Sequence, residues 1–155
     1  MKRIVYLFCI IISLTSCEKV LLERKYDRKI QGSWHIQSIT LAGNNNTYGM
    51  SIRGGDLTFN SDNTMKYVDL ENQVYTGEWI LYSMKEPWDC FEATPGTTYC
   101  NNNYNVIVNV DVKNSGGERK RVHFKYLELR KNGTLKAEVL GDNAIIWHIY
   151  NFVRK

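Results

Sequence analysis

The feature that most constrains the fold is an alternation of apolar and polar side chains, with a period of two residues, that recurs over most of the chain. It is clearest in YNVIVNVDV, residues 104–112, where every even position is apolar and the odd positions are polar apart from Ile107. Successive side chains of a β-strand point to opposite faces, so this pattern predicts a strand with one buried face. Seven further segments predict strands, although the last is apolar on both faces: WHIQSITL, DLTFN, TMKYVDL, YTGEWILY, RVHFKYLELR, TLKAEVL and AIIWHIYNFV.

Short polar stretches separate several of these segments and predict tight turns between antiparallel neighbours. They lie at residues 61–63, 114–117, 131–133 and 141–143. No segment has the pattern of a central helix, so we expect an all-β chain. The fold class that we predict is a small antiparallel up-and-down β-barrel of about eight strands, which holds either packed side chains or one small ligand. A β-sandwich is the alternative that the patterning leaves open.

The N-terminus predicts a segment that is removed from the working protein. Lys2 and Arg3 precede an apolar run of 11 residues, Ile4–Leu14, which is broken only by Ser13. A membrane-spanning helix takes about 20 apolar residues, so this run is too short to span. A basic start and a short apolar core are typical of a signal peptide. The next residues, LTSC at 14–17, resemble the lipobox of bacterial lipoproteins, in which the cysteine receives a diacylglycerol and becomes the N-terminus after cleavage.

This resemblance implies a lipoprotein signal peptide at residues 1–16 and acyl chains, such as palmitate, on Cys17. Residues 17–29 would then be a tether or a short helix, followed by one domain at residues 30–155. More than one acyl chain gives stable membrane attachment. The expected location is the cell envelope, with the outer membrane favoured over the inner, and the expected partner is the lipid bilayer. An ordinary signal peptide with a chance cysteine is the alternative.

Cys90 and Cys100 are the two cysteines that remain once Cys9 and Cys17 are assigned to the N-terminal segment. Export places them in an oxidising compartment, so we expect a disulfide between them. Pro95-Gly96 lies between the two and is a turn dipeptide that folds the segment back. A metal or redox pair is the alternative, but the spacing is neither CxxC nor zinc-like and no histidine lies nearby. We therefore expect no metal and no cofactor.

Two Gly-x-Trp motifs carry a second resemblance. IQGSW, residues 30–34, resembles the Gly-x-Trp opening of lipocalin-type barrels. LTFNSDNTMKY at 57–67, TGEWIL at 76–81 and the closing YNFVRK resemble small lipocalin-like lipoproteins of Bacteroides-type Gram-negative bacteria. The likeness covers residues 30–81 and the C-terminus, whereas residues 84–103 depart from it. It implies a lipocalin-like barrel that binds a small molecule or lipid, although a shared fold does not by itself specify a function.

The candidate ligand residues are aromatic side chains on the apolar stripes of the expected strands. They form either a packed core or the lining of a cavity for a small apolar ligand. The set is Tyr75, Trp79, Tyr104, Phe124, Tyr126 and Trp147. His35, His123 and His148 fall on the opposite faces and are expected to point outward, which argues against a shared metal site. No hydrolase, zinc-protease or phosphate-loop motif is present, so we expect no enzymatic activity.

Residues 84–103 place Trp88, Phe91 and Tyr99 in a turn-rich segment, which suggests a lid or contact loop or else packing on the barrel wall. Without residues 1–16 the net charge falls to +2, from 18 basic and 16 acidic residues, which is too weak for nucleic-acid binding. The function that we expect is non-enzymatic binding of a small apolar ligand by a membrane-anchored barrel. The alternative is an envelope interaction protein with a side-chain-filled barrel that contacts protein or glycan through its loops.

Overall fold

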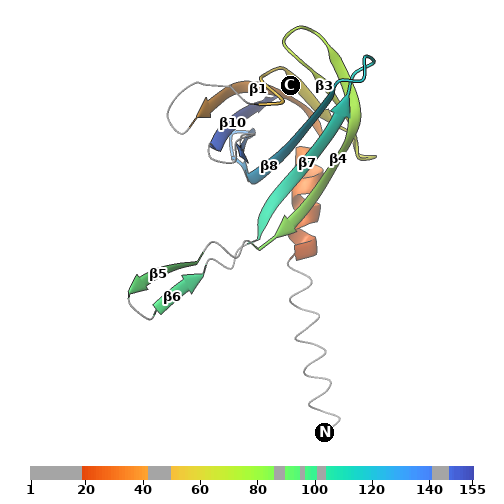
Figure 1. Ribbon diagram of the computed structural model, residues 1–155. Helices are drawn as coiled ribbons and strands as arrows, with labels where there is room; N and C mark the ends of the chain where they lie inside the picture. Colours follow the sequence, from red (N-terminus) through yellow and green to blue (C-terminus); the bar gives the residue numbers. More distant parts are fainter. Residues whose placement is uncertain (1–18, 42–49, 86–89, 95–96, 101–103, 141–146) are drawn as a thin grey trace, which may run out of the picture.

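The computed structural model describes residues 19–41, 50–85, 90–94, 97–100, 104–140 and 147–155 (Figure 1). Eight strands form a closed antiparallel barrel in the order β1-β10-β9-β8-β7-β4-β3-β2. Their bounds are Gly32–Leu41 for β1, Asp56–Phe59 for β2, Thr64–Val68 for β3, Val74–Met84 for β4, Asn105–Lys113 for β7, Arg119–Leu129 for β8, Thr134–Leu140 for β9 and Trp147–Arg154 for β10. The predicted all-β, up-and-down barrel is confirmed, and the sandwich alternative is wrong.

Strand β1 closes the barrel, because it pairs with the last strand on one side and with β2 on the other. Trp34 is opposite Arg154 of β10 and opposite Leu57 of β2. Two further strands, β5 (Cys90–Thr94) and β6 (Thr97–Cys100), pair with each other in a separate hairpin and with no other described strand. In this hairpin Cys90 is opposite Cys100 and Phe91 is opposite Tyr99.

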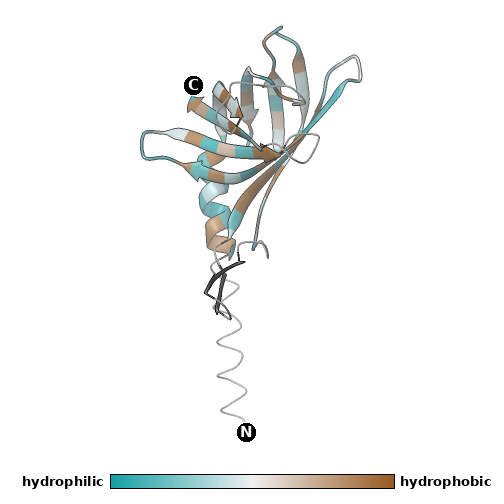
Figure 2. Cartoon of the chain, turned by 60° about the vertical axis from the view of Figure 1, so that its left-hand side comes forward, coloured by the Kyte–Doolittle hydropathy of each residue, from teal (hydrophilic) through white to brown (hydrophobic). Residues whose placement is uncertain are grey.

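The two-residue alternation of the sequence separates the inner and outer faces of the barrel wall, and hydrophobic and hydrophilic bands follow one another along the strands (Figure 2). In β9 the buried side chains are Leu135, Ala137 and Val139, with a half-buried residue between each pair. Because this antiparallel sheet packs one face on the core and leaves the other to solvent, the alternation determines which residues reach the interior.

A helix of residues 19–30 packs against the barrel, so the helix alternative for the segment after Cys17 is the one found (Figure 1). Leu22, Tyr26 and Ile30 recur every four residues, which places them on one helix face, and all three pack on the barrel core. The Tyr26 hydroxyl donates to the carbonyl of Leu127 over 3.0 Å. The Glu23 carboxylate accepts from the backbone N–H and the hydroxyl of Ser83, at 2.7 and 2.8 Å.

The first Gly-x-Trp motif joins this helix to the first and last strands of the barrel. Trp34 is 1% exposed, and its Nε1 donates to the carbonyl of Ile30 at the helix end over 2.6 Å. The Arg154 guanidinium lies 4.7 Å from the Trp34 ring centroid and donates to the carbonyl of Lys29 over 2.6 Å. A cation over an indole face and a satisfied indole N–H both stabilise a buried tryptophan.

The inner face of β10 was predicted wrongly. His148, Tyr150 and Phe152 are buried inside, whereas Trp147 lies on the outer face with Ile149. Since this strand is apolar on both faces, its sequence does not show which face points into the barrel. The outward orientation predicted for His35 holds, because its side chain is 45% exposed.

Burial of His148 leaves one of its ring nitrogens without a hydrogen bond to any described residue. Its Nδ1 is inaccessible and has no hydrogen-bond partner among the described residues. An unsatisfied buried polar atom costs about 1–3 kcal/mol. His148→Leu is therefore expected to raise the free energy of unfolding by about 1 kcal/mol, measured by urea denaturation. His35→Leu is the control and should not stabilise, because the His35 Nδ1 already bonds the Asp56 carboxylate at 2.8 Å. Equal effects of both variants would contradict this explanation.

Candidate functional site

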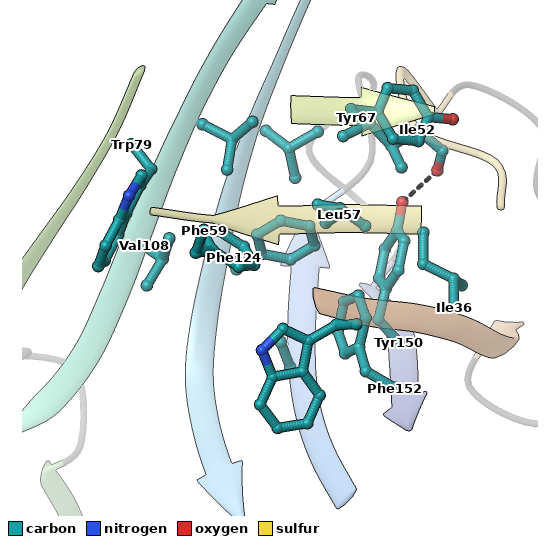
Figure 3. Packing of buried hydrophobic residues seen from close by; sticks show 14 of the residues in the cluster. Ile36, Ile52, Leu57, Phe59, Tyr67, Trp79, Val108, Phe124, Tyr150 and Phe152 are labelled. Atoms are coloured by element: carbon teal, nitrogen blue, oxygen red, sulfur yellow. Dashed lines mark hydrogen bonds between the residues drawn. The ribbon is translucent and has the colours of Figure 1, made fainter. Parts of the chain in front are cut away.

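Aromatic side chains pack against one another inside the barrel, together with aliphatic side chains (Figure 3). The Phe124 ring lies 5.3 Å from Tyr150 and 5.6 Å from Phe152, and Phe59 lies 5.4 Å from Trp79, all edge to face. These separations are those of close-packed rings. Three cavities lined by described residues, of about 580, 270 and 590 Å³, have neither Trp79 nor Phe124 in their linings. The core alternative therefore describes these two residues better than the apolar-cavity alternative.

The six aromatic residues predicted as a ligand site do not come together. Tyr75, Trp79 and Phe124 are buried inside the barrel. Tyr104 is half-buried just before β7, with the Lys85 ammonium 4.9 Å from its ring. Tyr126 and Trp147 lie against each other on the outer wall, with ring centroids 5.8 Å apart. Tyr126 leaves the interior because a bulge between Lys125 and Glu128 shifts the alternation of β8.

A cavity of about 580 Å³ opens at the mouth of the barrel where β3 and β7 end and β4 and β8 begin. The helix lies at the other end, because it contacts Ser83 near the end of β4 and Leu127 near the end of β8. Most side chains that line this mouth cavity are polar: Ser51, Arg53, Tyr67, Asp69, Glu71, Gln73, Tyr75, Glu118 and Lys120. Leu70, which is 72% exposed, is the apolar side chain at its rim.

Three side chains form the bonded centre of the mouth cavity. The Tyr75 hydroxyl donates to one oxygen of the Glu118 carboxylate over 2.7 Å, and the Lys120 ammonium lies 3.2 Å from the other. The same ammonium lies 4.6 Å from the centroid of the Tyr75 ring. Each group thus contacts the other two, which fixes their relative positions.

These contacts determine the charges of the centre. The hydrogen bonds from Tyr75 and Lys120 hold the pKa of the Glu118 carboxyl below its ordinary value. Burial and the Glu118 hydrogen bond raise the pKa of the Tyr75 hydroxyl. Burial alone would lower the pKa of Lys120, but its contacts with Tyr75 and Glu118 outweigh burial and raise it. Near neutral pH the centre therefore holds a carboxylate, an ammonium and a neutral phenol.

Local hydrogen bonds fix the two hairpin turns that carry these groups. Asp69 Oδ1 accepts from the backbone N–H groups of Glu71 and Gln73, at 2.9 and 2.8 Å, in the turn before β4. Asn114 Oδ1 accepts from the backbone N–H of Glu118 over 2.9 Å in the turn before β8. An Asx-type bond of this kind replaces backbone pairing and stiffens a turn. The mouth cavity is therefore bounded by ordered turns.

The segment between β1 and β2 forms the third wall of the mouth cavity. Ile52 is fully buried, and its carbonyl accepts from the Tyr150 hydroxyl over 2.6 Å, as drawn in Figure 3. The Gly54 carbonyl accepts from the Tyr67 hydroxyl over 2.8 Å. With Ile52 buried and Gly54 bonded to an inner tyrosine, the intervening Arg53 is exposed and reaches the cavity.

Sequence reasoning missed most of this site. Its polar residues lie in or beside turns, but Asp69 was placed within the expected strand TMKYVDL, and no binding role was predicted for Glu71 or Glu118. Tyr75 was included, but as part of an apolar lining. Two clusters of polar residues could have identified the site: Asp69, Glu71 and Gln73 before β4, and Glu118 and Lys120 at the start of β8. Alternate turns of an up-and-down barrel lie at the same end, so these two clusters are expected to meet there.

The other predicted sites lie partly outside the described residues. Cys17 and Trp88 fall in the undescribed segments, and only the backbone is described for Cys90, Phe91, Tyr99 and Cys100. Among the described residues, no helix has the length and apolar character that crossing a membrane requires.

Comparisons with protein-family models, with curated proteins and with solved structures yielded no match. The resemblance to lipocalin-like lipoproteins therefore stays a prediction.

Proposed function

We propose that this protein is a lipid-anchored, non-enzymatic component of the cell envelope that binds a short glycan at the mouth of a side-chain-filled barrel. The observation that carries the proposal is the mouth cavity of about 580 Å³ with its Tyr75–Glu118–Lys120 centre. The lipobox at residues 14–17 supports the anchor. The packed rings around Phe124 favour this function over binding of an apolar ligand in the interior.

A glycan suits the mouth cavity because each sugar hydroxyl both donates and accepts a hydrogen bond. The cavity offers carboxylates as acceptors in Asp69, Glu71 and Glu118, and cationic donors in Arg53 and Lys120. Hydrogen bonds to charged groups are stronger than those between neutral groups. The exposed Leu70 at the rim provides an apolar surface for the C–H face of a sugar ring.

The same chemistry favours binding over hydrolysis. Glycoside hydrolysis needs a carboxylic acid that is still protonated near neutral pH, and hence a raised pKa. The pKa of Glu118 is displaced in the opposite direction by Tyr75 and Lys120. Glu118 therefore suits the role of a permanent acceptor.

The expected disulfide is part of the proposal. Residues directly opposite each other in an antiparallel pair have Cα atoms about 4.5–5.5 Å apart, which is within the range that a disulfide spans. Cys90 and Cys100 hold such opposite positions in the β5–β6 hairpin. A disulfide there would link the first residue of β5 to the last residue of β6, at the open end of the hairpin.

Glu118→Gln is expected to weaken glycan binding at least about 10-fold, because a charge-assisted hydrogen bond contributes about 1.5–3 kcal/mol. The probe is an array of mono- to tetrasaccharides from bacterial surface polysaccharide, peptidoglycan and host glycans, followed by titration of the best binder. Wild-type affinity should hold down to about pH 5 and fall only in stronger acid, because a lowered carboxyl pKa keeps the charged form until the pH passes below it.

Glu138→Gln is the matched control, because Glu138 pairs with Lys136 over 3.0 Å at the same two-residue spacing but on the outer wall of β9. It should bind as the wild type does. Wild-type protein that retains no saccharide, or two variants that bind equally, would show that the mouth cavity is not a glycan site.

A further inference from the structure

Three of the six exposed large apolar side chains among the described residues lie at the end of the molecule opposite the mouth cavity. Val20 and Leu21 lie in the first described turn of the helix and are 39% and 60% exposed, and Met84 at the end of β4 is 39% exposed. The Glu23 carboxylate bonds the backbone N–H of Ser83, the residue before Met84. Since Val20 is one helical turn before Glu23, the three apolar side chains belong to one end of the molecule.

Two lysines and a tyrosine lie next to these apolar side chains, and the Lys19 ammonium is 3.9 Å from the Glu23 carboxylate. Lys19 and Lys85 are exposed, and the Lys85 ammonium lies over the Tyr104 ring at 4.9 Å. An apolar centre with lysines and a tyrosine at its edge matches the layers of a bilayer surface, where acyl chains lie beneath anionic headgroups. We name this set the anchor end: Lys19, Val20, Leu21, Met84, Lys85 and Tyr104.

The chain leads from the proposed lipid site directly to this end. Lys19 is two residues after Cys17, and it belongs to a helix whose later turns are fixed on the barrel core. Two residues reach at most about 7 Å. An acyl chain on Cys17 would therefore hold Val20 and Leu21 at the membrane surface.

We infer that the anchor end is a membrane-contact surface that docks on a lipid bilayer and presents the mouth cavity away from it. The inference rests on the proposed lipidation of Cys17. Strand β4 connects both ends, because Tyr75 of the mouth cavity is its second residue and Met84 of the anchor end is its last. At about 3.3 Å per residue along a strand, this separates the two sites by roughly 30 Å. The hairpin of β5 and β6 is joined to the barrel at the anchor end, through Lys85 and Tyr104.

The test uses the full chain with its acyl chains, purified and reconstituted in vesicles of phosphatidylethanolamine and phosphatidylglycerol. A ketone-bearing amino acid is encoded at residue 21 in one protein and at residue 84 in another, and each is coupled to a fluorophore. Bromine-labelled lipids should quench both fluorophores strongly. The control carries the fluorophore at residue 70, since Leu70 is 72% exposed at the opposite mouth. That fluorophore should stay unquenched.

Intact mass measured on the same samples distinguishes the two possible failures. Acylated protein whose labels at residues 21 and 84 are quenched no more than the label at residue 70 overturns the membrane-contact surface and leaves the anchor intact. Protein without acyl chains on Cys17 overturns the anchor and this inference with it. Acylated protein with quenching at residues 21 and 84 only supports the inference.

Discussion

Gly77→Ala is expected to lower the free energy of unfolding by roughly 3 kcal/mol or more, because it forces an atom into the backbone of the neighbouring strand. An ideal Cβ at Gly77 would lie 2.0 Å from the carbonyl oxygen of Asp111 and 2.8 Å from the Cα of Val112. Gly77 is opposite Val112 in the ladder between β4 and β7. A backbone cannot rotate aside as a side chain can, so the strand pair must separate locally.

The matched control is Gly116→Ala in the turn before β8. Its nearest contact would be the Asn114 side chain at 3.4 Å, an ordinary van der Waals distance. Both substitutions remove the same backbone freedom from the unfolded chain, so the difference between them reports the clash alone. Urea denaturation of both variants measures that difference. If the two midpoints and slopes coincide, the close approach of β4 and β7 does not require glycine.

The close approach of β4 and β7 is also a physical reason for the second Gly-x-Trp motif. Gly77 permits the close approach of β7, and two residues later Trp79 is buried, with its Nε1 donating to the carbonyl of Asn60 over 3.0 Å. In the sequence the motif was recognised only through its resemblance to other barrels. The contacts explain why glycine and tryptophan are needed at that spacing.

Much of the barrel could be predicted from the sequence because two local rules, one for strands and one for turns, govern it. Each strand that faces the core on one side must alternate, and each tight turn needs residues suited to it. Segment 104–112 therefore indicated β7 and its buried valines correctly. The helix at residues 19–30 was left open, because its core contacts are three side chains spaced by four residues within a mostly charged segment.

The wrong predictions concern strands whose local sequence pattern does not show which face points into the barrel. Strand β10 is apolar on both faces, so His148 and Trp147 were assigned to the wrong sides. A bulge between Lys125 and Glu128 moved Tyr126 to the outer wall, and a second bulge lies between Ile36 and Ser38 of β1. A bulge adds one residue to one strand only, so it depends on pairing that the local sequence does not reveal.

Cys17→Ala is expected to abolish labelling of the protein with tagged palmitate and to move it from the membrane fraction to the salt-washed soluble fraction. One acyl chain gives only marginal attachment, whereas two or three give stable anchoring at about 0.8 kcal/mol per buried CH₂ group. Cys9→Ala is the matched control, since Cys9 lies within the expected signal peptide, and it should keep both the label and the attachment.

We expect that the anchor end alone does not substitute for the acyl chains proposed on Cys17. Full burial of a valine, leucine or methionine side chain contributes about 1.5–3 kcal/mol, and each lysine near an anionic surface adds about 1 kcal/mol. Val20, Leu21 and Met84 are only 39–60% exposed, so part of each side chain is covered before docking. A bilayer surface covers the remainder only in part, so each residue contributes less than the value for full burial. The Cys17→Ala protein should therefore bind vesicles weakly and in a salt-sensitive manner. If it stays with membranes after a high-salt wash, the apolar end rather than the lipid anchors the protein, because salt removes the attraction of Lys19 and Lys85 but leaves apolar burial unchanged.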